Sequence, residues 1–404
     1  MDPSLLSEKV KGYLDTLCYQ IPNRRVGSEG NRQATSFFGE TMRSFGFEVV
    51  YPEFDCVDWQ SEGAVLSMNE EVLQAQPSPY SLGALVKAPL VMASSASDLE
   101  TLDLSDKILL MRGGLTQEQF LPKYFPFFQV EEQQKIIHLL ETKQPRAIIT
   151  ATTRTPEMAG ALYPFPLFED GDFDIPSVFV TDELGARIAA YAGCDVGLEI
   201  RARRIPARAC NVVARKGGNT KERMVLFAHI DAKLGTPGAL DNGTGIATLL
   251  LLAELLKEYT GEKCIEIVAL NGEDYYSNPG EQLYLLQNEA RYEEISLGIN
   301  IDGLGYVEGK TAYSMYGCPP ELTAAIEAVF AQNEVFLAGE PWFQGDHAIF
   351  LMNQRPALAL TSERIYELMT QFVHTDRDTP EIIDPDKVVR TALVLHQFLV
   401  QQDY

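Results

Sequence analysis

The chain has 404 residues, of which 46% are hydrophobic and 22% charged, and its formal net charge is −24. This length exceeds what one hydrophobic core usually holds, so two domains are expected, and the composition is that of a globular protein. The negative charge argues against nucleic acid and anionic membranes as partners, because both repel an acidic surface.

The cysteines and the N-terminus bear on the cellular location. The six cysteines are widely scattered, so the sequence predicts neither a zinc ribbon nor a dense disulfide scaffold. The N-terminal residues 1–17 form a polar amphipathic pattern without the basic start and apolar core of a signal peptide. The apolar run 249–256 contains Glu254 and is too short to span a membrane. We therefore expect a cytoplasmic, reducing location.

The first half of the sequence contains two segments that differ in proline content and in the length of their apolar runs. Helices are expected over residues 4–20 and 31–44, followed by a strand over 47–54. Residues 57–207 are instead rich in proline and in short apolar runs, which indicates a separate β-rich domain. Within it, strands are expected over 64–68, 107–114, 146–152 and 177–181, and helices over 130–141 and 182–191. The predicted domains are thus a discontinuous catalytic domain (1–56 and 208–404) and an insert (57–207).

From about residue 209 strands and helices alternate. Strands are expected over 209–215, 224–230, 264–271, 296–302 and 356–361, and helices over 243–259, 279–291, 319–333 and from about 385. This alternation predicts an α/β fold, an α/β/α sandwich with a mixed, largely parallel sheet. Sites in such sheets form beyond the carboxyl ends of strands. His229, the pair Glu273–Asp274 and Asp302 each follow a predicted strand, so they should meet at one edge.

Each of these side chains has an ordinary interpretation and a functional one. His229 and Asp231 can form a capped strand end, or a metal ligand whose imidazole donates to the neighbouring carboxylate. Asp241 precedes a helix, so it can be an N-cap or a bridging metal ligand. Asp302 and His374 can be turn and loop residues.

The adjacent acids Glu273 and Asp274 carry the sharpest signal. Two carboxylates in one pocket repel each other unless cations share the site. One of them can then bind metal while the other takes a proton from a water. Considered together, the set predicts metal-assisted hydrolysis.

The ordered set resembles family 28 of the metallopeptidases, the co-catalytic di-zinc aminopeptidases and carboxypeptidases. The resemblance covers about residues 1–56 and 209–404. The matching motifs are HID (229–231), GALDNGTG (238–245), NGED (271–274), NID (300–302), GDH (345–347) and HTDRDTP (374–380).

The resemblance implies a zinc exopeptidase fold and two zinc ions per chain. His229 and Asp302 would hold one zinc, and Asp274 and His374 the other. Asp241 would bridge them, Glu273 would be the general base, and Asp231 would support catalysis. The implied reaction is hydrolysis of N-terminal residues of peptides by a two-metal hydroxide mechanism, with the carboxypeptidase reaction left open.

Three further expectations follow from the resemblance. The peptide bond Asp241–Asn242 is expected to be cis, as is frequent in this family. The insert 57–207 resembles a protease-associated domain, which is thought to shape substrate access. Asp274 is the one departure, because the family usually has glutamate there, although aspartate is a competent zinc ligand.

Two alternatives on the same fold stay open. A glutaminyl-cyclase-like acyltransferase uses one zinc, whereas His229 would hold a second one here. A non-catalytic binding protein, like the transferrin-receptor relatives, has lost the ligand set that this chain retains. The aromatic residues Tyr366, Phe343 and Phe372 lie near the motifs and can line a pocket or pack in the core, and the Asp346–His347 pair can support the site or face substrate.

Overall fold

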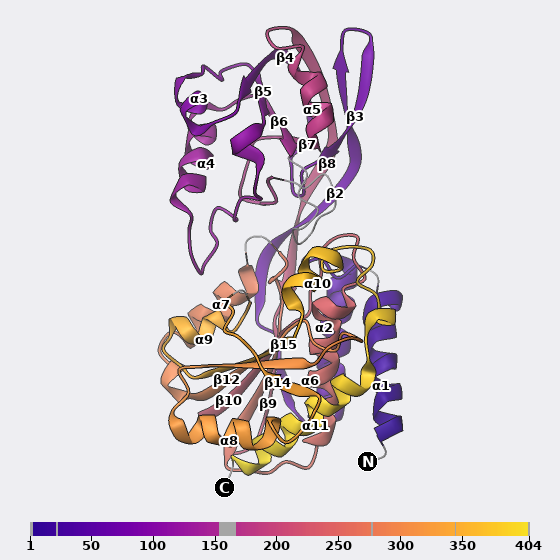
Figure 1. Cartoon of the computed structure of the whole chain (residues 1–404), viewed down its shortest axis with the longest axis vertical. Coiled ribbons are helices and arrows are strands. Elements are labelled where there is room, and N and C mark those ends of the chain that lie inside the picture. Colours follow the sequence, from indigo (N-terminus) through magenta and orange to yellow (C-terminus); the bar gives the residue numbers. More distant parts are fainter. Residues whose placement is uncertain (1–2, 22, 153–166, 276–277, 344, 403–404) are drawn as a thin grey trace. The chain divides into compact units, whose positions relative to one another are not determined.

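The computed structural model describes residues 3–21, 23–152, 167–275, 278–343 and 345–402. Its contacts divide the chain into two units (Figure 1). Unit 1 comprises Met1–Cys56 and Arg208–Tyr404, and unit 2 comprises Val57–Ala207. Among the described helices, none combines the length and the apolar character needed to cross a membrane.

Unit 1 is built on one eight-stranded mixed sheet. Its strands lie in the order β1 (Glu48–Val50), β9 (Val212–Lys216), β11 (Lys263–Leu270), β10 (Asn219–His229), β12 (Ile295–Ile301), β15 (Ala357–Ser362), β13 (Thr311–Tyr316) and β14 (Phe336–Ala338). The four central strands β11, β10, β12 and β15 are parallel, whereas β9 and β13 run antiparallel to their neighbours β11 and β15. The predicted α/β class with a mixed sheet is confirmed.

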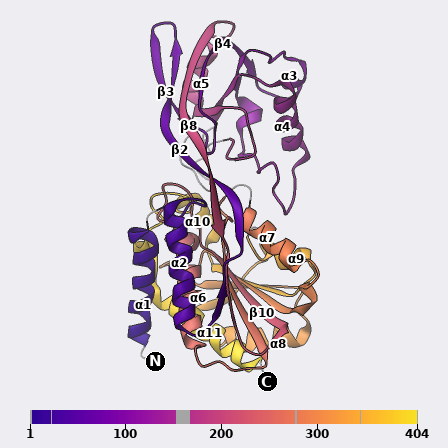
Figure 2. The ribbon, with the colours of Figure 1, turned by 180° about the vertical axis from the view of Figure 1, so that it is seen from behind.

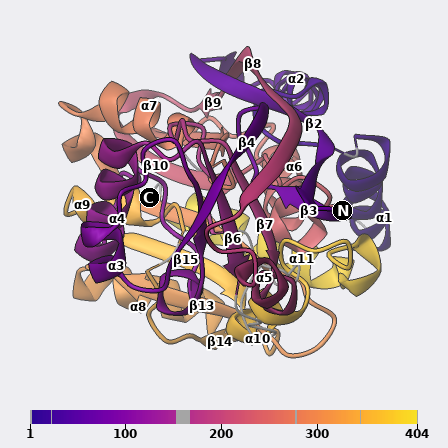
Figure 3. The same ribbon diagram turned by 90° about the horizontal axis from the view of Figure 1, so that it is seen from above.

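Helices cover both faces of this sheet. They are α1 (Pro3–Asp15), α2 (Glu29–Ser44), α6 (Thr244–Leu255), α7 (Pro279–Asn288), α8 (Pro320–Phe330), α9 (Ala348–Met352), α10 (Ile365–Gln371) and α11 (Pro385–Gln401). Figures 2 and 3 show α1, α2 and α6 on one side of the sheet and α9 on the other. Strand alternation explains the division, because Leu226 joins the core under α6 while its neighbour Phe227 packs on Tyr284 of α7 and Phe350 of α9.

Helix α6 is more deeply buried than its sequence pattern predicts. Amphipathic helices usually bury one face, but here every residue from Thr244 to Glu254 is buried. The cause is that α1, α2 and α11 all pack against α6 in addition to the sheet. A helix that is apolar around its whole circumference belongs in such an interior position. The helix also ends earlier than predicted, at Leu255.

Unit 2 is β-rich, with a closed barrel of seven strands. Its order is β2 (Glu53–Met68), β3 (Glu71–Pro77), β7 (Ser177–Thr181), β6 (Ala147–Thr152), β5 (Ile108–Met111), β4 (Ala84–Ala93) and β8 (Asp195–Cys210), with helices α3 (Ala96–Thr101), α4 (Glu131–Lys143) and α5 (Asp182–Ala189). The expectation of short strands is wrong for β2 and β8, which have 16 residues each and continue into unit 1. Exposed and buried residues largely alternate along both strands. Neither strand therefore contains a continuous apolar run of the kind from which the other strands of this unit were predicted.

A buried ion pair anchors the amino end of the central sheet. Arg223 on β10 has no exposed surface, and its Nη1 lies 3.1 and 3.2 Å from the two carboxylate oxygens of Glu266 on β11. Glu266 also accepts hydrogen bonds from Tyr284 at 2.8 Å and from Arg215 at 2.6 Å. Burial would raise the pKa of Glu266, but the two guanidinium groups hold it below its usual value.

We expect Arg223→Met to lower the free energy of unfolding by about 3–5 kcal/mol, because it leaves the buried Glu266 carboxylate with one partly exposed guanidinium partner. The chain has two tryptophans, so urea unfolding followed by Trp342 fluorescence in a Trp59→Phe background reports on unit 1. The control is Arg32→Met, which removes a half-exposed side chain that pairs with Glu29 and donates to the carbonyl of Gly27, and it should lower stability much less. An equal loss of unfolding free energy in both variants would contradict the stabilising role of the Arg223–Glu266 pair.

Candidate metal centre

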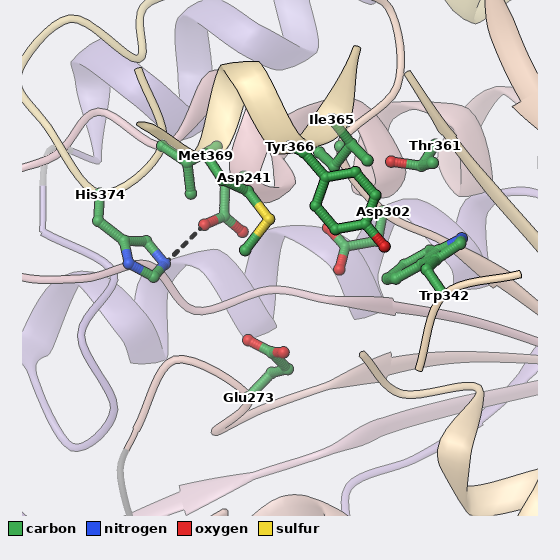
Figure 4. Close-up of a pocket in the computed structure, with 11 residues that line it drawn as sticks. Asp241, Glu273, Asp302, Trp342, Thr361, Ile365, Tyr366, Met369 and His374 are labelled. Atoms are coloured by element: carbon green, nitrogen blue, oxygen red, sulfur yellow. Dashed lines mark ion pairs between the residues drawn. The ribbon is translucent and has the colours of Figure 1, made fainter. Parts of the chain in front are cut away.

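The ends of three parallel strands bring the predicted site residues together. His229 is the last residue of β10, Glu273 and Asp274 follow the end of β11, and Asp302 follows β12. The carboxyl ends of parallel strands lie at one edge of the sheet, which is where sites of α/β proteins form. Figure 4 shows Glu273 and Asp302 facing one pocket together with Asp241 and His374 from other segments.

Asp241 lies between the two histidines. Its Oδ1 is 2.9 Å from Nε2 of His229, and its Oδ2 is 2.9 Å from Nε2 of His374. Nε2 of His229 also lies 3.7 Å from Oδ1 of Asp302, and Nε2 of His374 lies 2.9 Å from Oδ1 of Asp274. Asp241 therefore presents one oxygen to each histidine, and each histidine faces one further carboxylate. The shorter side chain of Asp274 reaches its histidine.

This cluster fits cations. The ligand atoms of His229, Asp241 and Asp274 lie within 4.8 Å of one another, and all three residues are buried. Oδ2 of Asp274 is buried and accepts no hydrogen bond from the part of the chain that the structure describes. Several buried carboxylates are costly unless cations balance them. Imidazole nitrogen and carboxylate oxygen are ligands that zinc takes in proteins.

The carboxylates of the site raise the pKa of both histidines. Burial would lower the pKa of His374, but Asp274 and Asp241 raise it to about 10. Burial would likewise lower the pKa of His229, whereas its carboxylate neighbours raise it well above its usual value. Both shifts favour the protonated imidazole, because the carboxylates around it are negatively charged. A metal ion would replace these protons, since it binds neutral imidazole.

Glu273 carries a strongly perturbed carboxyl group. Burial raises its pKa, His229 opposes the rise, and the charges of Asp274, Asp302 and Asp241 add to it, so the pKa lies well above the usual value. A carboxyl group of raised pKa beside a metal cluster suits the acceptance and return of a proton. Bound cations would offset the neighbouring acids and so moderate this shift.

The carboxylate of Asp231 holds the loop of Glu273. The Nδ1–H of His229 donates to the backbone carbonyl of Asp231 at 3.2 Å, while the carboxylate lies 3.7 Å away. The carboxylate instead accepts hydrogen bonds from the amides of Gly272 at 2.8 Å and Asp274 at 3.0 Å. The carboxylate thus lies within ion-pair distance of the imidazole, as expected, while its hydrogen bonds go to the two flanking amides of the Glu273 loop.

We expect Asp231→Asn to lower turnover by about 10–100-fold, the usual effect of losing a partner that orients the ligand shell. The amide offers one acceptor to two N–H donors, so the Glu273 loop loosens. The control is Asp170→Asn in unit 2, where a buried aspartate also accepts two backbone amides, from Lys123 and Asp172. The measurement is the steady-state turnover of both variants, corrected for the fraction of folded protein. Equal turnover in the two variants would contradict the role of Asp231.

Hydrogen bonds at both ends hold the loop of Asp241. Asp378 accepts from the amides of Leu240 at 2.6 Å and Asp241 at 3.0 Å. The side chain of Asn242 donates to the carbonyl of Ile301 at 2.8 Å. The Asp241–Asn242 bond is cis, as predicted. The N-cap alternative for Asp241 is wrong, because Gly243 precedes the helix and the Asp241 carboxylate faces the histidines.

An apolar pocket opens beside the acids. It has a volume of about 110 Å³ and is lined by Asp241, Glu273, Asp302, Gly303, Trp342, Thr361, Ile365, Tyr366, Met369, Val373 and His374 (Figure 4). Of the three aromatic residues left open, Tyr366 lines it, whereas Phe343 contacts Tyr316 and Phe372 packs against the core.

The Asp346–His347 pair lies outside the lining of this pocket. Both residues are buried, and neither lines the pocket. Nε2 of His347 lies 2.8 Å from the carbonyl of Trp342, and burial lowers the pKa of this imidazole to about 4. The neutral ring therefore donates to the carbonyl of a pocket residue and supports the pocket wall from behind.

Two asparagines beneath the site, Asn211 and Asn271, were not predicted to support it. Oδ1 of Asn211 accepts from the amide of Asn271 at 3.0 Å, and its Nδ2 donates to the carbonyl of Gly280 at 2.8 Å. Both asparagines are fully buried. The available signal was a polar amide within or directly after an apolar strand run, in CNVVA and in ALNGED. A buried amide in such a place must be hydrogen-bonded, and here it orders the chain that precedes Glu273.

Comparison with known proteins identifies relatives of both units. The model of peptidase family M28 matches residues 211–399. The chain is 28% identical over 238 residues to a probable lipoprotein aminopeptidase, LpqL, of Mycobacterium tuberculosis, which covers 56% of this chain and 44% of that protein. It thus spans less than half of that relative's length. It is 22% identical over 365 residues to a probable leucine aminopeptidase 2 of Aspergillus oryzae, covering 85% of this chain and 70% of that protein.

Two solved structures share the fold. An aminopeptidase from Aneurinibacillus sp. strain AM-1 has a TM-score of 0.74 and 19% identity, and covers 98% of this chain and 93% of its own. A zinc aminopeptidase from Bacillus subtilis has a TM-score of 0.75 and 17% identity, and covers 98% of this chain and 94% of its own. These similarities establish the architecture in which the cluster sits.

Proposed function

We propose that the protein is a zinc-dependent aminopeptidase of peptidase family M28, whose model matches residues 211–399, and that it binds two zinc ions per chain. The observation that carries the proposal is the position of Asp241, with one carboxylate oxygen 2.9 Å from each of two histidines. That placement supports one bridging ligand between two metal positions. His229 and Asp302 would hold one zinc, and Asp274 and His374 the other.

The chain's own residues supply the proton transfers. Zinc, when bound, polarises the scissile carbonyl and lowers the pKa of the attacking water. Glu273 lies across the pocket from Asp241 and His374 (Figure 4), where its carboxylate can take the proton of that water. The same carboxyl group then returns the proton to the departing amine. Asp231 keeps Glu273 in place through the amides on either side of it.

The charges and shape of the pocket support cleavage at the N-terminus. Among the described residues that line it, none is lysine or arginine, so it offers no cationic side chain for the carboxylate of a C-terminal residue. A peptide bound by its N-terminal residue places no terminal carboxylate in this pocket and needs no such partner. The walls formed by Ile365, Met369 and Val373 favour an apolar side chain on the residue that is released.

A substrate panel tests this proposal. Zinc-loaded protein should release p-nitroaniline from leucine and phenylalanine p-nitroanilides faster than from the glutamate compound. It should leave N-acetyl-leucine p-nitroanilide intact, because the acetyl group removes the ammonium. Hippuryl-phenylalanine, a carboxypeptidase substrate, should also stay intact. Cleavage of hippuryl-phenylalanine with no release from the free p-nitroanilides would overturn the aminopeptidase assignment.

Two finer points belong to the same proposal. We propose that the insert 57–207 is a protease-associated domain. We also propose that the protein is located in the cytoplasm. All the proposed ligands and Glu273 come from unit 1, so replacing residues 57–207 by a Gly/Ser linker should leave zinc binding intact. A protease-associated role requires that this variant, if folded, changes its preference among peptides of two to ten residues. Unchanged preference would reduce the insert to a stability module.

A further inference from the structure

The segment between α1 and α2 contacts both loops of the metal centre. We call residues 23–31 the N-terminal clamp. Ser28 begins helix α2 by accepting from the amide of Asn31 at 3.1 Å, and its hydroxyl donates to the carbonyl of Asn23 at 3.0 Å. A Cβ at Gly30 would lie 2.0 Å from that carbonyl oxygen, so this tight turn needs glycine. The turn points Arg24 and Asn31 toward the sheet edge.

Arg24 holds the chain between the first two motifs. Its side chain is buried and donates to four backbone carbonyls: Nε to Ile230 at 3.0 Å, Nη1 to Leu17 at 2.6 Å and Pro237 at 2.8 Å, and Nη2 to Gly238 at 2.8 Å. Three of these carbonyls lie between His229 and Asp241. Because the guanidinium group is planar and rigid, it fixes the distance between the two ends of the 230–238 loop.

Asn31 holds the loop of the general base. Its Nδ2 donates to Oδ1 of Asn271 at 2.8 Å, and Nδ2 of Asn271 donates back to Oδ1 of Asn31 at 3.0 Å. Nδ2 of Asn31 also donates to the carbonyl of Arg24 at 2.9 Å, which connects the two contacts. Asn271 precedes Gly272 and Glu273 directly, so this reciprocal amide pair fixes where the loop leaves strand β11.

We propose that Arg24 and Asn31 are positioning residues that set the distance between the His229–Asp241 loop and the Glu273–Asp274 loop, and hence the affinity of the site for metal. The proposal rests on the proposed function for the identity of the site. Neither residue lines the pocket or touches a proposed ligand side chain, so both act through backbone and amide contacts. Hydrogen bonds of this kind around a metal site typically change metal affinity by about 10–100-fold when they are lost.

Cobalt binding tests the proposal without relying on activity. The apoproteins of the wild type, Arg24→Met and Asn31→Leu are titrated with Co²⁺ alone, and the visible absorption of the bound ion reports its ligand geometry. We expect about 10–100-fold weaker binding in both variants and an altered spectrum. The matched control is Arg223→Met, which removes another buried guanidinium at the opposite end of β10. It should lose stability but keep the cobalt affinity within about twofold of wild type, since it has no contact with either loop.

The outcomes separate the two claims. Failure of the wild type to bind Co²⁺ overturns the proposed function itself. Binding by the wild type with unchanged affinity and spectrum in both clamp variants overturns the positioning role. Equal weakening in Arg223→Met also overturns it, because general destabilisation would then be the cause. If Arg24→Met does not fold, Asn31→Leu decides.

Discussion

Replacing Glu273 by glutamine is expected to lower turnover by about 10²–10⁴-fold while zinc binding is retained. Glutamine keeps the shape of the side chain but cannot take a proton from water. Glu273 lines the pocket, and burial together with the neighbouring acids raises the pKa of its carboxyl group, which marks it as the group of the site best suited to carry a proton. Turnover of leucine p-nitroanilide and zinc content are measured on the same preparation.

The zinc measurement makes the Glu273→Gln result specific. A loss of turnover together with a loss of zinc would point to a ligand role, which the proposed assignment excludes. Near-normal turnover would remove Glu273 from the mechanism altogether. Glu281→Gln is a suitable control, because this neighbouring acid is also fully buried but does not line the pocket.

Asp241→Asn is expected to abolish turnover and to reduce bound zinc below one equivalent. The amide removes the negative charge shared by both metal positions, and its NH₂ group would face one of the two histidines that now lie 2.9 Å from the carboxylate. Asp302→Asn is the matched comparison, because of the two histidines of the site Asp302 pairs with His229, at 3.7 Å. It should retain about one zinc ion, since one of the two positions stays intact. Equal zinc loss in both variants would contradict a bridging role that is unique to Asp241.

The fold of unit 1 follows closely from the sequence pattern. The strands β10, β11, β12 and β15 and the helices between them gave strong signals, because strands buried on both faces are continuous apolar runs. The edge strand β14 and its neighbour β13 were missed, since short strands at the side of a sheet carry mixed residues. Helix α6 was recognised, but the burial of its whole surface depends on α1, α2 and α11, which no local pattern reveals.

For the site as well, the sequence predicted the residues but not the hydrogen bonds that hold them. The sequence motifs predicted which residues meet at the sheet edge, because strand ends and residue chemistry are both visible in the sequence. They did not reveal that Asp231 holds the amides of Gly272 and Asp274, nor that Asp378 holds those of Leu240 and Asp241. Such contacts join segments 41 to 138 positions apart, and only the folded chain decides which donor reaches each carboxylate.

The most direct test of a two-zinc aminopeptidase is a zinc titration of the apoprotein with binding and turnover recorded together. Metal is removed by dialysis against a chelator, and zinc is then added in steps of a fraction of an equivalent. Bound zinc is measured by elemental analysis and turnover by release of p-nitroaniline from leucine p-nitroanilide. We predict that binding saturates at two zinc ions per chain and that turnover, absent in the apoprotein, rises to its maximum as the second ion binds. Saturation at one ion, or full turnover in the metal-free protein, would contradict it.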